Sequence, residues 1–501
     1  MPVYQLGEFR LDTAAYRLTK NAAVLTATPR QLDLLSYLAT RPGQLVTRDE
    51  LFQQLWPDVI VSDNALTQLV SDLRQVLGDA SSAPRYVQTV ARRGYRFIAA
   101  VELTDPSAIV LETTERSAVR PRGRETSNLE VLRAVVDGRL QLEALDANEV
   151  AMAIANFERA VALDPGFAAA YVGLANAHFW QYEQSRFLFR PDSGLLATAI
   201  HEARRGVALA PDYAEAHATL AYLFAGAGRT DEAMAAAHRA IALQPDYWGH
   251  HFRLGHVSWG QVRLDSMSRG LALYPEFPFA YFEMATVHVA RQALEMAIRV
   301  LEEGVALQDS LAAAPSRFPA SGLHWMLGTI RLARGDAAGA LEAFDREMNS
   351  GGSGLYAREH MVASLNGRAF ALARGGHREE AAELFSRSLA LHPQQVRPHL
   401  GRALLARHGG EGSLERALAD AAEAISGVQR GGRTTEALLM SAAEQVVRGQ
   451  LESAYASLDQ LLTERPSGAE GWLIPIEPLF EPLAGQPAFR GVLAKLAQRA
   501  A

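Results

Sequence analysis

Between Asn64 and Gln75 the sequence carries a row of short polar side chains at helical spacing. Asn64, Thr67, Gln68, Ser71 and Gln75 stand at positions i, i+3, i+4, i+7 and i+11, so a helix would place them on one face. Amide and hydroxyl groups both donate and accept hydrogen bonds, as reading base edges in the major groove of double-stranded DNA requires. Simple solvation is the alternative, although solvated helix faces favour Lys, Glu and Arg. We interpret the five residues as candidate base readers.

Basic side chains gather further along the chain, in a segment with the pattern of a hairpin. Residues 85–98 read as two strands joined by a tight turn, with Arg92 and Arg93 projecting from the turn and Gly94 suited to it. Arg96 follows in the second strand. Because guanidinium groups at such a tip suit DNA phosphates, these three arginines are candidate phosphate-binding residues.

Two further arginines precede or border the polar face. Arg48 lies near the start of a predicted helix, where backbone N–H groups and the helix dipole favour phosphate, and it is a further candidate phosphate contact. Arg74 lies at one edge of the polar face. The sequence leaves two roles open for it, a contact to phosphate or a base and packing against its own domain.

The segments that would position these residues begin with short strands. Val3–Asp12 alternates apolar and polar residues, and residues 16–19 and 24–26 have the composition of further strands. Alternation of this kind is typical of strands with one buried face. The sequence therefore predicts a small antiparallel sheet at the start of the chain.

Three helices are predicted between this sheet and the hairpin. Residues 28–31 have the pattern of an N-cap, a Pro at the first helical position and a capping-box Gln, for a helix running to about Arg41. Residues 47–50 repeat the capping pattern for a short helix ending at Trp56-Pro57. The third helix runs from Asp63 to Leu77. Its apolar stripe consists of Leu66, Leu69, Val70, Leu73 and Leu77. A helix-turn-helix followed by a basic hairpin is a winged helix.

The order of several short motifs makes this prediction more specific. They are Thr28-Pro29…Leu34-Leu35, Pro42-Gly43…Val46-Thr47-Arg48-Asp49-Glu50-Leu51, Leu55-Trp56, Leu73-Arg74 and Arg85-Tyr86-Val87…Arg93-Gly94-Tyr95-Arg96-Phe97. Through them residues 3–99 resemble the effector domain of the OmpR/PhoB class of bacterial response regulators. The resemblance implies that residues 63–77 enter the major groove and that the hairpin at 92–94 reaches toward the adjacent minor groove.

Two residues depart from the pattern of this class. Asp72 stands where many relatives have a basic residue, and Ala91 where many have Arg or Pro. A carboxylate at 72 repels phosphate or accepts a hydrogen bond from a cytosine amine. Residues 1–103 hold eleven Arg or Lys and ten Asp or Glu, a net charge of +1, while the rest of the chain carries −8. We expect modest affinity for one half-site, which pairing on two half-sites would multiply.

The remainder of the chain repeats itself. Endings of the form A-[VIL]-x-L-x-P close units at Pro165 and Pro245, with relaxed forms at Pro211 and Pro275. The intervals between these closing positions are 46, 34 and 30 residues. Small residues between the prolines let two antiparallel helices approach closely. A helix–turn–helix period near 34 residues resembles the tetratricopeptide repeat, and the resemblance covers most of residues 134–468.

The composition and the missing motifs argue against several kinds of functional site. The chain has no cysteine, and its two lysines, Lys20 and Lys495, stand outside any phosphate-loop pattern. His-Glu-x-x-His and Gly-x-Ser-x-Gly motifs are missing as well, so we expect no enzyme, no cofactor and no metal. No apolar run has the length of a membrane span and Met1–Arg10 has no signal-peptide pattern, so we expect a cytoplasmic protein without a membrane partner. The net charge of −7 means that the whole chain has no basic field that would indicate nucleic-acid binding.

The predicted fold is mostly α, with an N-terminal α+β winged helix-turn-helix followed by an α-solenoid. We expect a DNA-binding domain at residues 1–103, a linker at 104–127, a solenoid of eight or nine tetratricopeptide hairpins at 128–471 and a cap at 472–501. This architecture resembles HilA-like one-component bacterial transcriptional regulators. The predicted partners are promoter DNA and a protein, a peptide or a second copy of the chain on the solenoid. The alternative is an interaction scaffold whose winged helix has lost specific DNA binding.

Overall fold

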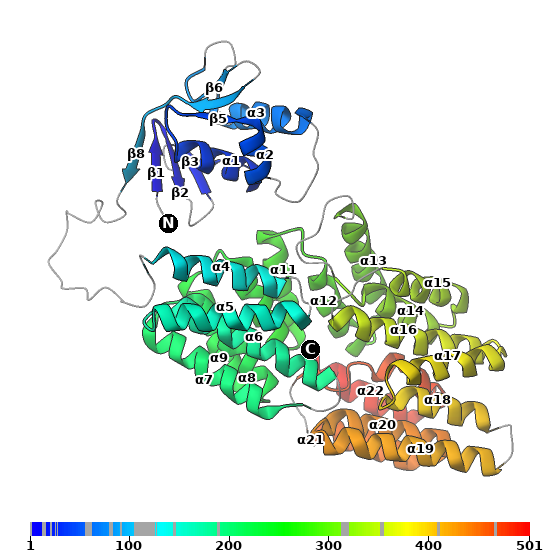
Figure 1. Ribbon diagram of the computed structural model, residues 1–501. Coiled ribbons are helices and arrows are strands. Elements are labelled where there is room, and N and C mark those ends of the chain that lie inside the picture. The colour runs from blue at the N-terminus through cyan, green and yellow to red at the C-terminus, as the bar shows by residue number, and fades with distance from the viewer. Residues whose placement is uncertain are drawn as a thin grey trace. The chain divides into compact units, whose positions relative to one another are not determined.

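The computed structural model divides into two compact units, Met1–Val119 and Arg120–Ala501. Figure 1 shows a small unit of strands and helices followed along the chain by a long array of helices. The structure describes residues 3–12, 17–20, 23–25, 27, 29–55, 63–79, 84–90, 93–104, 126, 128–143, 147–187, 191–311, 320–350, 355–407, 411–464 and 468–501. The predicted fold class, a winged helix followed by an α-solenoid, is confirmed.

An antiparallel sheet of five strands opens the first unit, in the order β4-β3-β2-β1-β8. Its strands are β1 (Val3–Leu6), β2 (Phe9–Asp12), β3 (Arg17–Lys20), β4 (Ala23–Leu25) and β8 (Val101–Thr104). The stretch that alternates over residues 3–12 forms two strands rather than one, because the chain reverses at Gly7 with φ of 62° and pairs Leu6 with Phe9. The sequence did not indicate β8, which pairs with β1.

Three helices and a second sheet complete the first unit. The helices are α1 (Pro29–Ala39), α2 (Arg48–Leu55) and α3 (Asp63–Leu77). The second sheet has the order β5-β7-β6, with β5 (Leu45–Thr47), β6 (Val87–Val90) and β7 (Gly94–Phe97). The predicted N-cap of the second helix is confirmed, since the Glu50 backbone N–H donates to the Thr47 hydroxyl at 3.2 Å. The Glu50 carboxylate accepts a hydrogen bond from the Tyr37 hydroxyl at 3.0 Å.

The apolar stripe predicted for the third helix forms the centre of this unit. Leu66, Leu69, Val70, Leu73 and Leu77 are all buried, together with side chains from α1 and from both sheets. Tyr95 and Phe97 of β7 lie in the same core. Burial of this stripe turns the opposite, polar face of α3 away from the core.

The second unit is built of helical hairpins. Eighteen helices, α4 to α21, pack in consecutive pairs as nine hairpins within the described part of the chain. They are α4 (Leu129–Glu143), α5 (Ala147–Leu163), α6 (Ala168–Phe187), α7 (Ser193–Leu209), α8 (Ala214–Gly226), α9 (Thr230–Leu243), α10 (Trp248–Val257), α11 (Gly260–Leu273), α12 (Phe279–Ala290), α13 (Leu294–Leu311), α14 (Leu323–Ala333), α15 (Ala337–Met348), α16 (Leu355–Arg374), α17 (Arg378–Leu391), α18 (Val396–Ala406), α19 (Glu411–Arg430), α20 (Thr434–Arg448) and α21 (Leu451–Glu464).

One packing device recurs between neighbouring hairpins. Phe385 of α17 is fully buried against Gly401 of α18, where a Cβ atom would lie 2.3 Å from the ring. Phe344 of α15 meets Gly367 of α16 in the same way, at 2.4 Å. In each case the ring fills the space that a missing side chain leaves on the next hairpin. This is the physical basis of the small residues seen in the repeats.

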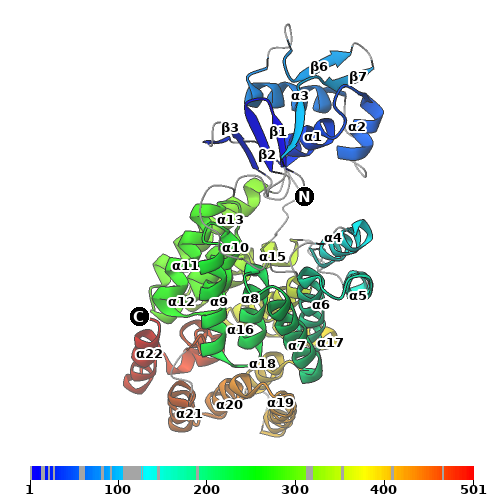
Figure 2. The ribbon, with the colours of Figure 1, turned by 90° about the vertical axis from the view of Figure 1, so that its left-hand side faces the viewer.

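The C-terminal segment does more than cover the last hairpin. It comprises η2 (Ile474–Ile476), η3 (Pro478–Leu483) and α22 (Pro487–Arg499). η2 and η3 pack on α14, and α22 packs on both α21 and α12, as Figure 2 shows for α22. Arg291, next to α12, donates hydrogen bonds to the backbone oxygens of Ala500 at 2.8 Å and Ala501 at 2.9 Å. The array therefore curves back upon itself.

A second closing contact joins the beginning and the later part of the array. The Tyr356 hydroxyl of α16 donates to the Glu183 carboxylate of α6 at 3.3 Å. The Trp180 and Tyr356 rings lie 5.6 Å apart. Helices that are separated by more than 170 positions along the chain thus meet across the interior of the curve.

Candidate nucleic-acid interface

Helix α3 presents its polar face where the sequence predicts it. Thr67 and Ser71 are exposed, on the side opposite the buried Leu66 and Leu73. Asn64, Gln68 and Gln75 lie on the same helix, and their side chains fall outside the described residues. The backbone thus holds all five predicted base readers on one rigid helix, at the predicted limits Asp63–Leu77.

The hairpin of β6 and β7 is the wing. Its strands pair from Val87 with Phe97 to Val90 with Gly94, and β7 also pairs with β5. Arg93 is exposed at the end of the hairpin, and Arg92 lies outside the described residues. The prediction that Gly94 serves the turn is wrong. Gly94 begins β7, and a Cβ atom there would lie 2.0 Å from the Val46 carbonyl oxygen, so glycine is required by the close pairing with β5.

Two of the predicted phosphate contacts come together at the start of α2. The Arg48 backbone N–H donates to the Arg93 carbonyl at 3.3 Å, so these two arginines are neighbours although 45 positions separate them. Arg48 is half-buried and Arg93 exposed. Arg96 is half-buried in β7, on the strand face opposite Tyr95 and Phe97. The structure thus brings the backbone of the wing next to the N-terminus of α2.

Arg74 is held against its own domain. Its guanidinium group donates to the Val87 carbonyl at 2.7 and 3.3 Å and to the Thr89 hydroxyl at 2.8 Å. Of the two roles left open by the sequence, the structure provides the packing role. Arg74 ties the last turn of α3 to the first strand of the wing.

A carboxylate to which the sequence pattern gave no role completes this connection. Asp79 follows α3, is 8% exposed and accepts three backbone hydrogen bonds, from Arg85 at 2.6 Å, Tyr86 at 3.2 Å and Val87 at 2.8 Å. The signal available was a carboxylate just after the glycine that ends a helix, at Gly78 with φ of 59°. We define the α3–wing clamp as Arg74 and Asp79, because together they fasten the helix to β6.

The ring of Tyr86 anchors the base of the wing in the core. It packs edge-to-face on Phe9 at 5.2 Å and lies 6.5 Å from Phe97. Burial raises the pKa of the Tyr86 hydroxyl, and the neighbouring Glu8 carboxylate acts in the same direction. The phenol therefore stays neutral at physiological pH, as a core side chain should. The wing is fixed at its base by both polar and aromatic contacts.

Among the residues that the structure describes, no cluster of three or more His, Asp or Glu side chains has an arrangement that would hold a metal ion. None of the helices in these ranges combines the length and the apolar character that a bilayer crossing needs.

Two family models match the chain. The model described as "Transcriptional regulatory protein, C terminal" matches residues 22–97. The tetratricopeptide repeat model matches residues 192–265 and 367–428. The first match covers α3 and the wing, and the second covers parts of the helical array.

Individual proteins match the first unit. The transcriptional activator CadC of Escherichia coli strain K12 is 36% identical over 101 residues, which are 20% of this chain and 20% of CadC. The cholera toxin homolog transcriptional activator of Vibrio parahaemolyticus is 41% identical over 75 residues, 15% of this chain and 26% of that protein. The solved DNA-binding domain of E. coli CadC is 33% identical, covering 21% of this chain and 98% of that domain, with a TM-score of 0.19. The chain thus spans about a fifth to a quarter of the length of these curated relatives.

Proposed function

We propose that this chain, in which an OmpR/PhoB-type winged-helix domain precedes tetratricopeptide repeats, regulates bacterial transcription by binding promoter DNA. The observation that carries the proposal is the α3–wing clamp, Arg74 and Asp79. A winged helix engages two neighbouring grooves at once, so the helix and the wing must keep a constant separation. The clamp supplies that constraint, and both activators named above match this domain.

The proposed contacts divide into two groups. α3 lies in the major groove, where base edges are read by Asn64, Thr67, Gln68, Ser71 and Gln75. Phosphates are contacted by Arg48, Arg92, Arg93 and Arg96, and the wing approaches the minor groove. Arg74 acts as a positioning residue, because its guanidinium group is engaged within the domain. The DNA-binding domain comprises residues 1–103 in this proposal.

The solenoid is assigned a sensing or assembly role. In the proposal residues 128–471 bind a protein or a peptide, or pair two copies of the chain, and residues 104–127 link them to the DNA-binding domain. Pairing would suit DNA binding, since a net charge of +1 on residues 1–103 gives each copy a weak attraction to DNA. The protein acts in the bacterial cytoplasm, where the chromosome lies, and the proposal includes no catalytic role.

The test is genome-wide DNA occupancy of the intact protein beside an Arg92→Ala/Arg93→Ala variant. We expect discrete peaks that the variant loses, and in vitro a log–log salt slope shallower by about 0.9 per lost phosphate contact. The matched control is Arg10→Ala/Lys20→Ala, which removes the same charge from β2 and β3. Absence of peaks with folded protein, or equal loss in the control, would contradict the proposal and favour an interaction scaffold that does not bind DNA specifically.

A further inference from the structure

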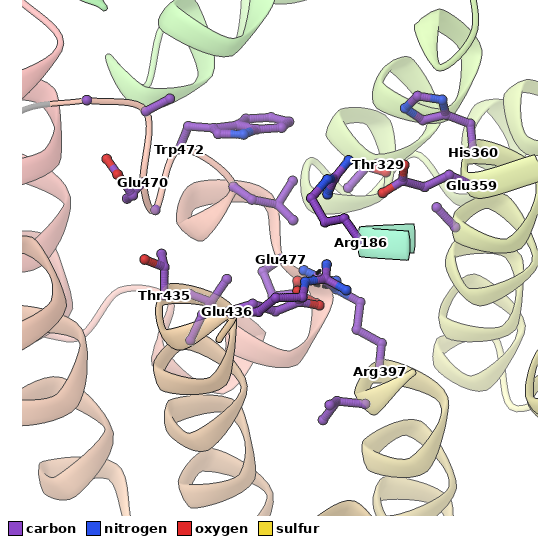
Figure 3. A pocket seen from close by; sticks show the side chains of 18 of the residues that line it. Arg186, Thr329, Glu359, His360, Arg397, Thr435, Glu436, Glu470, Trp472 and Glu477 are labelled. Atoms are coloured by element: carbon purple, nitrogen blue, oxygen red, sulfur yellow. Dashed lines mark hydrogen bonds and ion pairs between the residues drawn. The ribbon is translucent and has the colours of Figure 1, made fainter. Parts of the chain in front are cut away.

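The curved helical array encloses a cavity of about 740 Å³. Figure 3 shows side chains converging on it from α6, α16, α18, α20 and the C-terminal segment. Its size lies within the range of pockets that hold metabolite-sized molecules. The walls come from helices far apart in sequence, so the cavity exists only because the array closes on itself.

Three buried oxygen atoms on the cavity wall have no hydrogen-bond partner among the described residues. Oε2 of the half-buried Glu470 forms an ion pair with Arg499 at 3.7 Å. The remaining two atoms belong to buried residues. One is Oε1 of Glu477, a residue that is 3% exposed and whose other carboxylate oxygen pairs with Arg397 at 2.9 Å. The other is Oδ1 of Asn366, a residue that is 2% exposed and whose amide donates to Gln395 at 2.9 Å. Buried acceptors normally find donors. N–H or O–H groups of a bound molecule would satisfy both atoms.

The charged side chains around the cavity include one carboxylate that has no ion-pair partner among the described residues. Four arginines line it, and each already has a carboxylate partner. The pairs are Arg186 with Glu183 at 2.8 Å, Arg263 with Glu283 at 2.9 Å, Arg397 with Glu477, and Arg433 with Glu436. Glu470, also on the wall, pairs with Arg499 at 3.7 Å. Glu359 lies near enough to Arg186, Arg397 and Arg433 to favour their charged forms, yet among the described residues no hydrogen bond or ion pair joins it to them. Counted with all these partners, the wall has one carboxylate more than it has arginines, so the complementary ligand is positive.

Aromatic rings form another part of the wall. Trp325 and Trp472 meet edge-to-face at 6.4 Å, and the His360 ring lies 5.5 Å from Trp325. Indole faces attract organic cations more strongly than other side chains do. Trp472 and Glu477 both belong to the C-terminal segment, whereas Trp325, His360 and Glu359 belong to the hairpins. A ligand in the cavity would therefore bridge the two parts.

We propose that this cavity binds a small organic cation bearing N–H groups, an ammonium or a guanidinium compound. Its N–H groups donate to Glu477 Oε1 and Asn366 Oδ1, its charge is balanced by Glu359, and its carbon chain packs on Trp325 and Trp472. The idea extends the sensing role of the proposed function by naming the class of ligand. Binding itself requires no DNA, so it is testable even if the DNA-binding proposal fails.

The experiment is isothermal titration calorimetry on the full chain with four probes of similar size: butylguanidinium, butylammonium, tetramethylammonium and butyrate. We expect saturable one-to-one binding of the first two, at least about tenfold weaker binding of tetramethylammonium, which has no N–H group, and no binding of butyrate. Failure of both N–H cations to bind at millimolar concentration overturns the proposal. Equal affinity for tetramethylammonium overturns the assignment of the two acceptors.

Two variants sharpen the result. Glu359→Gln removes the surplus charge without breaking an ion pair, so we expect folded protein with binding weakened about tenfold or more. The matched control is Glu303→Gln on α13, an exposed glutamate outside the cavity, which should bind as the unaltered chain does. Unchanged binding by Glu359→Gln contradicts the proposal. If saturating butylguanidinium leaves DNA affinity unchanged, the cavity still binds cations, but the link to sensing is refuted.

Discussion

Replacing Asp79 with Ala tests whether the α3–wing clamp acts as the structure suggests. The change removes the acceptor of three backbone N–H groups, at 2.6, 3.2 and 2.8 Å. Water reaches the exposed Arg85, but Tyr86 and Val87 are buried. In the variant, the backbone N–H groups of Tyr86 and Val87 are buried without an acceptor, at about 1–2 kcal/mol each. The closed state of the wing base should therefore lose about 3 kcal/mol of stability. Because 1.4 kcal/mol is a factor of ten, local opening should rise about a hundredfold.

The assay is hydrogen–deuterium exchange with mass spectrometry on the full chain. Peptides covering residues 85–90 should exchange about a hundredfold faster in Asp79→Ala, while the helical array exchanges as before. Ser71→Ala, an exposed change on the neighbouring helix, is the control and should leave these peptides unaltered. Protection of residues 85–87 in Asp79→Ala equal to that in the parent would refute the clamp, and with it the reasoning that links α3 to the wing.

Two further predictions concern the helical array. Gly401→Ala should lower the free energy of unfolding by about 1–3 kcal/mol, because its Cβ would lie 2.3 Å from the Phe385 ring; chemical denaturation measures this. Gly427→Ala is the control, since only the tip of Arg430 lies nearby, and the change should be neutral or stabilising. Burial lowers the pKa of His250 to about 4 from its ordinary 6.5, so the unfolded chain takes up the proton first as pH falls. Stability should therefore drop between about pH 6.5 and 4, by up to about 3 kcal/mol, and a His250→Gln variant that keeps the full acid dependence would show that this histidine is not its source.

The sequence was most informative where structure is local. Helix α3 begins and ends as predicted because its apolar stripe and its closing glycine lie within fifteen residues of one another. The clamp was harder to foresee, since Arg74 and Asp79 are surface-type residues whose roles depend on a strand that follows several residues later. The requirement for glycine at 94 was assigned to the wrong cause for the same reason: the crowding atom, the Val46 carbonyl oxygen, lies far away in sequence.

The repeat pattern of the sequence could not predict the cavity. Tetratricopeptide spacing predicts that each hairpin packs on its neighbours, and it contains no information on how far the array curves. Closure depends on pairs such as Tyr356 with Glu183 and on the return of the C-terminal segment to α12 and α14. Arg397 and Glu477, which lie 80 positions apart, become partners only after that closure. Neither residue stands out in the sequence.

The bond from Arg291 to the backbone of Ala501 has a consequence during protein synthesis. The two residues are 210 positions apart. At a synthesis rate of about 5–20 residues per second, Ala501 is therefore added roughly ten to forty seconds after Arg291. The hairpins formed in this interval have an uncovered inner surface and no finished cavity. Each newly made chain therefore passes through an open stage, in which a chaperone has access to surfaces that the completed protein conceals.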